Sequence, residues 1–136
     1  MLSNDFANDI LKFVFNKTGI SGIGDNLYIS LHTADPGADG NQASNEVSYT
    51  GYERVTLPRN ANWFVINGTV MNPAQTIEFG EMTGGDSQTV VYMCIGMDKT
   101  GAGKVLFRFA LTPGITTGVG VMPRIRTSTA LLAVTA

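Results

Sequence analysis

The sequence is poor in the side chains on which most enzyme and metal sites depend. Its 136 residues include one cysteine, Cys94, and one histidine, His32. A single cysteine excludes a disulfide within the chain, and its apolar neighbours in "VVYMCIGM" predict a small buried hydrophobe. Zinc needs three or four His, Cys or carboxylate ligands, and serine–histidine catalysis would have to use His32. We therefore expect no catalytic residue, no zinc site and no cofactor, and we interpret His32 as a surface or loop-packing histidine.

Charge is scarce as well. Charged residues make up 15% of the chain, with a formal net charge of −2, whereas ordinary globular domains contain about 25%. The Lys and Arg residues are scattered, although phosphate binding needs them clustered. No hydrophobic run approaches the ~18 residues of a membrane span, and Asp5 and Asp9 stand where a secretory signal would be basic. We expect neither nucleic acid nor a membrane as a partner.

Glycine, in contrast, is abundant, with 16 residues, and turn sequences separate a series of short runs with strand character. Asn67-Gly68 is typical of a tight hairpin, and Pro58 is expected to end a strand. The runs cover residues 27–32, 52–57, 62–66, 69–71, 75–79, 89–97, 104–111, 119–126 and 130–135. About eight short strands predict an all-β fold, specifically a jelly-roll-like β-sandwich.

The length and the apolar runs predict how these strands are organised. A chain of 136 residues is expected to form a single β-sandwich domain over 1–136, with a helix within 1–19 and a long loop at 33–50. Runs 89–97 and 104–111 are almost wholly apolar at their centres. They are therefore expected to be central strands, covered by a second sheet on one face and by the helix or a neighbouring subunit on the other.

One amphipathic α-helix is predicted at residues 3–18. Ser3 is expected to cap its start, Lys17 to lie in its last turn and Gly19 to stop it. This helix would pack on the protein's own sheet or, alternatively, dock onto a partner subunit. Apolar residues recur along it at three- and four-residue spacing, namely Phe6, Ala7, Ile10, Leu11, Phe13 and Val14.

The polar connection at residues 33–50 is longer than the ~12–15 residues usual within a compact domain. Its oxygen-bearing side chains, Asp35, Asp39, Asn41 and Glu46, offer a calcium set, but their spacing is not that of an EF-hand. The sequence "DPGADG" also reads as two turns in series, in which each aspartate bonds nearby backbone N–H groups. We favour turn chemistry and keep a bound cation at Asp35, Asp39 and Glu46 as the alternative.

Two stretches carry a resemblance to a known family. "LYISLHTADPG" followed by "GYERV" resembles a family of small tailed-bacteriophage virion structural proteins, and residues 95–121 are similar to that family's downstream pattern. The predicted N-terminal helix matches as well, so the resemblance covers most of the chain. The sequence departs from the pattern at 122–126, "MPRIR", which is more basic than expected. The resemblance implies a non-enzymatic structural protein located in the virion, with no catalytic residues to transfer.

These observations lead to three hypotheses of function. The first is a capsid decoration (cement) protein that binds the major capsid protein and copies of itself as a trimer or dimer. The second is a tail-associated or tail-fibre structural protein, with tail proteins as partners. The third is a carbohydrate-binding module that uses Tyr49 or Trp63 as a sugar platform. Candidate interface residues are Phe6, Ile10 and Phe13 on the helix and Pro36, Asp39, Asn41, Gln42 and Asn45 on the loop.

Overall fold

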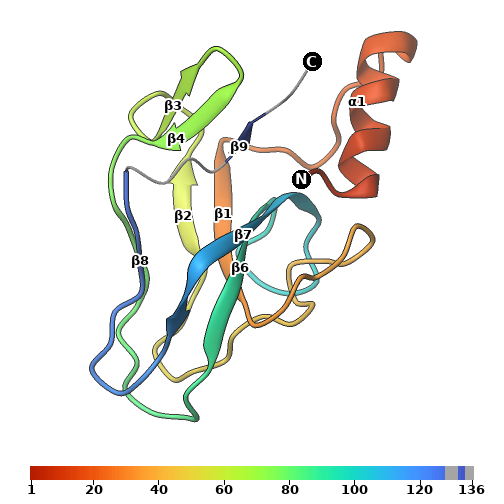
Figure 1. Ribbon diagram of the computed structural model, residues 1–136. Helices are drawn as coiled ribbons and strands as arrows, with labels where there is room; N and C mark the ends of the chain where they lie inside the picture. The colour runs from red at the N-terminus through yellow and green to blue at the C-terminus, as the bar shows by residue number, and fades with distance from the viewer. Residues whose placement is uncertain (128–131, 134–136) are drawn as a thin grey trace.

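The computed structural model describes residues 1–127 and 132–133, in which a helix stands beside antiparallel sheets (Figure 1). The predicted all-β class with an N-terminal helix is confirmed. Residues 130, 131, 134 and 135 of the last predicted strand lie outside the described residues. The elements are α1 (Asn4–Asn16), β1 (Asn26–His32), β2 (Val55–Pro58), β3 (Phe64–Asn67), β4 (Val70–Pro73), β5 (Ile77–Glu78), β6 (Thr89–Gly96), β7 (Val105–Thr116), β8 (Arg124–Ile125) and β9 (Leu132–Ala133).

The main sheet has the strand order β2-β1-β6-β7, and each of its pairs is antiparallel. Its edge strands are β2 and β7, so the prediction that residues 104–111 form a central strand is wrong. The two edge strands contain Pro58 and Pro113. An edge strand tolerates proline because one side of its ladder needs no donor. Pro58 ends β2 as expected, but β7 continues through Pro113 to Thr116, beyond the predicted end of the run at residue 111.

A second layer packs on one face of the main sheet. It consists of the three-stranded sheet β3-β4-β9 and the two-stranded sheet β5-β8. Buried side chains from both layers meet in one cluster that includes Ile29, Leu31, Leu57, Met71, Ile77, Phe79, Met93, Ile95, Phe109 and Ile125. Alternate residues of a strand point to opposite faces, so these positions assign one face of β1, β6 and β7 to the core.

The opposite face of the main sheet is buried as well. Ser30, His32 and Cys94 point away from the core and have no exposed surface, and Arg108 is 9% exposed. The expectation that β6 and β7 are covered on both faces is met, but the predicted cover was the helix or a neighbouring subunit. The long loop contributes to this cover, because its residues bond Arg108, the end of β1 and the 96–103 turn. The helix α1 packs at the start of β7.

Several predicted strands are shorter than expected, and the run at 75–79 pairs only at Ile77 and Glu78. Of residues 119–126, only Arg124 and Ile125 pair as a strand, because a turn that includes Gly120 at a φ of 87° occupies the start of the run. The run predicted at 52–57 pairs only from Val55 onward. Its first residues, Tyr52 and Arg54, direct their side chains to the long loop instead.

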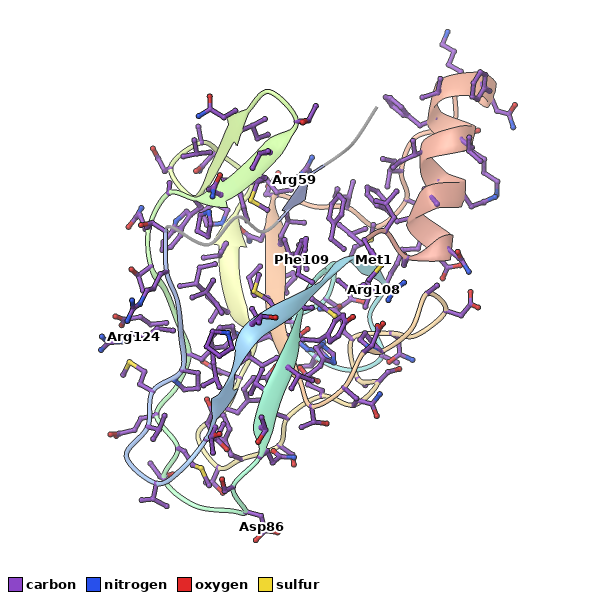
Figure 2. All side chains as sticks on the ribbon, viewed as in Figure 1. Met1, Arg59, Asp86, Arg108, Phe109 and Arg124 are labelled. Carbon is purple, nitrogen blue, oxygen red and sulfur yellow. The ribbon has the colours of Figure 1, made fainter. Side chains whose placement is uncertain are left out.

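The helix is anchored through its first half. Ser3 caps it as predicted, since its hydroxyl accepts the Phe6 N–H at 3.1 Å. Lys17 is the left-handed C-cap with a φ of 56°, so the prediction that it lies in the last turn is wrong. Phe6 packs edge-on against Phe107 of β7 with ring centroids 5.3 Å apart, while the later turns stand clear of the domain (Figure 2). Within the described residues, no helix has the length and hydropathy that a membrane span requires.

Candidate functional site

An ion pair fastens the end of the long loop. Arg54 Nε and Nη2 each lie 2.8 Å from a carboxylate oxygen of Glu46, and the Arg54 side chain is only 4% exposed. Tyr52 donates its hydroxyl to the same carboxylate at 2.6 Å and accepts the Leu31 N–H at 3.2 Å. Arg54 also donates to the carbonyls of Asp98 and Gly101. The "GYERV" sequence therefore closes the loop and joins it to the turn after β6.

The histidine lies under the loop and not on the surface. His32 Nδ1 is 2.7 Å from the Ser44 carbonyl, which can only accept, so Nδ1 carries the proton. In the neutral ring Nε2 then accepts from the Ser30 hydroxyl at 2.8 Å. Burial lowers the pKa of His32, which favours this neutral form. Neither Ser30 nor His32 is exposed to solvent, so the pair supports the loop and offers no nucleophile to a substrate.

The three acids of the calcium alternative do not converge. Asp35 receives both its partners from the fold: Arg108 Nη1 lies 2.7 Å from each oxygen, and the Gly37 N–H donates at 2.8 Å. Burial opposes ionisation of Asp35, but these two donors hold its pKa below the usual range. Asp39 accepts from the Asn4 amide at 2.9 Å, and Glu46 is paired with Arg54. Across residues 1–127 and 132–133 there is no group of three His, Cys, Asp or Glu suited to a metal ion.

Gln42 occupies a slot that two glycines form. It is fully buried, its side chain accepts the Asp98 N–H at 3.0 Å, and its backbone N–H donates to the Gly103 carbonyl at 2.9 Å. A Cβ added at Gly96 would lie 2.2 Å from Gln42 Cδ, and one at Gly103 would lie 2.0 Å from its Oε1. Both distances are far below van der Waals contact. Gly96 and Gly103 therefore make the room that the Gln42 side chain occupies.

The predicted interface residues fall into three groups by their exposure. Phe6 and Gln42 lie inside the fold, so neither side chain is available at the surface of this copy. Ile10 is half-buried beside Phe6, as are Pro36 and Asn41 on the loop. Phe13, Asp39 and Asn45 are exposed, and their role in an interface stays a prediction.

The helix has an exposed apolar face, and the interface prediction did not include its residues. Leu11, Val14 and Phe15 are 57%, 61% and 79% exposed. Their spacing of three and four residues places them on one side of α1, beside the row that begins at Phe6. The sequence signal for this exposed face was the width of the apolar pattern on α1. A helix that only covers its own sheet needs a narrower apolar stripe.

The remaining candidate residues pack in the interior of the protein. Burial raises the pKa of the Cys94 thiol to about 12, which makes it a poor nucleophile. Tyr49 is 3% exposed and donates its hydroxyl to the Gly80 carbonyl at 2.6 Å. Trp63 packs against the main core cluster. Neither aromatic ring therefore presents the open face that a sugar platform needs.

Comparison with known proteins places the chain in a family. The sequence model of the family described as podophage GP4 fiber I protein gp80 matches residues 1–131. Among curated proteins, none matches the sequence. The match covers nearly the whole chain, including the helix, the long loop and the main sheet. It agrees with the resemblance to phage virion structural proteins at that broader level. The chain belongs to the podophage GP4 fiber I protein gp80 family, a family of phage virion structural proteins.

Proposed function

We propose that this protein is a non-enzymatic structural component of the phage tail, associated with its fibres. The family is described as one of fibre proteins, which favours the tail-associated hypothesis over capsid decoration. The described polar clusters also support a structural role, because the loop acids, His32 and Arg54 are all bonded to partners within the fold.

The observation that carries the proposal is the exposed apolar face of α1. Leu11, Val14 and Phe15 are more than half exposed on a helix that stands clear of the domain. A contiguous apolar patch on a soluble domain marks a contact surface. A fibre component needs such a surface, because it must be held in place by other virion proteins. Tail proteins are therefore its proposed partners in the virion.

Electron cryomicroscopy of purified virions that carry this protein tests the proposal. We expect density that fits the main sheet and α1 at the tail, in a small number of copies around the tail axis. Antibody labelling of the same virions, with gold particles counted at the tail and on the head, provides an independent readout. Density repeated over the capsid lattice would overturn the tail assignment and support the decoration hypothesis.

A further inference from the structure

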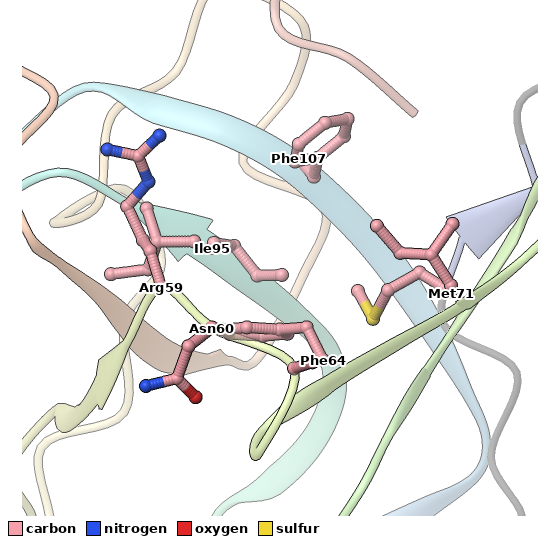
Figure 3. A pocket seen from close by; sticks show the side chains of 9 residues that line it. Arg59, Asn60, Phe64, Met71, Ile95 and Phe107 are labelled. Carbon is pink, nitrogen blue, oxygen red and sulfur yellow. The ribbon is translucent and has the colours of Figure 1, made fainter.

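An apolar groove of about 570 Å³ lies between the main sheet and the β3–β4 hairpin (Figure 3). Three side chains of the main sheet form one wall, and three of the hairpin form the other. Arg59, Asn60 and Ala61 line its edge. The sheet wall is Leu27, Ile95 and Phe107, and the hairpin wall is Phe64, Ile66 and Met71. Ile66 is 72% exposed, so the groove has an apolar lip that the domain itself leaves uncovered.

The groove and the exposed helix face lie at the same end of the domain. Phe107 is shared, since it packs against Phe6 of α1 and also lines the groove. Figure 1 shows α1 and the β3–β4 hairpin projecting at that end. A two-fold axis placed between them would carry the helix of each copy toward the groove of the other, so each copy could give and receive one helix.

We propose that Leu11, Val14 and Phe15 of one copy occupy the groove of a second copy, and that the exchange is reciprocal. This proposal rests on the proposed fibre role and names a second copy of the chain as the partner of its apolar helix. In this contact a helix lies in a hydrophobic groove, and the side chains that enter the groove are spaced three and four residues apart.

The available area supports two contacts and not one. Large apolar side chains bury roughly 150–200 Å² each, so the exposed fractions of Leu11, Val14 and Phe15 amount to about 350 Å². The groove walls are largely buried already and would lose about half as much, which gives about 500 Å² for each helix. Two contacts together reach the ~1,000 Å² that a specific interface should clear, whereas a single contact is only about half that size.

Charge does not oppose the contact. On the helix, Asp9 lies on the opposite side and binds Lys104, and the exposed Lys12 flanks Phe15 with a stem long enough to keep its ammonium group in water. The one charged residue of the groove, Arg59, donates to the Gly24 carbonyl at 2.7 Å and lies at the edge. An entering apolar helix therefore buries no unpaired charge, which would otherwise cancel the gain from apolar burial.

Sedimentation velocity of the purified protein over a concentration series tests the dimer. We expect the wild-type chain to dimerise, and Phe15→Glu and Ile66→Glu each to weaken the dimer by about 30-fold or more, as expected for anchors at an interface centre. Both side chains are exposed, so the variants should keep the wild-type unfolding midpoint. Val119→Glu is a matched control for the helix, because Val119 is 74% exposed and lies in the turn before β8. Val65→Glu is the control for the groove, because the neighbouring side chain in β3 points to the other face.

Mixing the two defective variants separates reciprocal exchange from other arrangements. A Phe15→Glu copy retains its groove and an Ile66→Glu copy retains its helix, so one intact contact forms only in the mixed pair. Because one contact is weaker than two, we expect mixed dimers by native mass spectrometry only at higher protein concentration than the wild type needs, and at a concentration at which each variant alone is monomeric. A monomeric wild-type protein, a helix that closes on its own groove, or controls as damaging as the test variants would overturn the proposal. The virion density reports separately on the fibre role, because a tail location with a monomeric protein would refute only the exchange.

Discussion

Gly96→Ala is predicted to expel Gln42 from its slot and so to detach the long loop from the turn after β6. The three heavy atoms nearest to an added Cβ all belong to Gln42, at 2.2, 2.4 and 2.5 Å. The φ of Gly96 lies outside the left-handed region, so alanine brings no backbone strain. The effect of the substitution is therefore steric and falls on one side chain.

The magnitude follows from what Gln42 would lose. Forcing a methyl group into a filled site costs about 1–3 kcal/mol, and the lost hydrogen bond to the Asp98 N–H adds about 0.5–1.5 kcal/mol. We expect the free energy of unfolding to fall by about 2–4 kcal/mol in urea titrations followed by circular dichroism. The protein should stay folded, since domains of this kind are stable by about 5–15 kcal/mol.

A double-mutant cycle isolates the clash. In a Gln42→Ala background the added methyl group meets empty space, so Gly96→Ala should cost less than about 1 kcal/mol there. Gly24→Ala is the matched control, because no heavy atom lies within 4 Å of its added Cβ and its φ is not left-handed. Equal costs of Gly96→Ala in the two backgrounds would refute the slot.

Three further measurements test the fastening of the loop. Arg54→Met leaves the Glu46 carboxylate without its cation and should lower the free energy of unfolding by about 3 kcal/mol; Glu46→Gln added to it should restore part of the loss, and no recovery would contradict the pairing. Burial lowers the pKa of His32, so below its ordinary pKa of about 6.5 the unfolded chain binds a proton that the folded chain does not. Stability should then fall with decreasing pH by up to about 1.4 kcal/mol per unit, and urea titrations at pH 7, 6 and 5 should show a flatter dependence for His32→Gln; an unchanged slope would exclude His32 as the cause. Cys94, with its thiol pKa raised to about 12, should react with a maleimide dye only after denaturation, whereas rapid labelling of native protein would place the thiol at the surface.

Features with a local signal could be predicted from the sequence. The start of α1 follows from the Ser3 side chain, which bonds an N–H three residues away. The central strands follow from alternation and apolar runs, and β1 and β6 lie within one residue of their predicted limits. Such signals depend on residues close together in the chain, so no knowledge of the fold is needed.

The role of the long loop could not be predicted in this way. The alternation of polar and apolar residues in β1 correctly predicted that His32 points away from the core. Its burial, however, depends on the loop at Ser44, which folds back over the histidine. Gln42 is one polar residue among many in a polar loop, and only the fold brings Gly96 and Gly103 to its side chain. The burial of Phe6 and the exposure of Phe15 likewise depend on where the domain ends beneath the helix, which the apolar pattern of α1 does not encode.

The polar cover of the main sheet has a consequence for synthesis of the chain. The loop partners lie far downstream, since Asp98 follows Gln42 by 56 residues and Arg108 follows Asp35 by 73. Translation adds about 5–20 residues per second. Several seconds therefore pass between synthesis of the loop and synthesis of the glycines around Gln42 and of Arg108. An apolar cover strand would spend that interval as an aggregation-prone edge. A cover built from Asp, Asn, Gln and Ser can remain in water until the sheet is complete, and it then docks through hydrogen bonds and ion pairs.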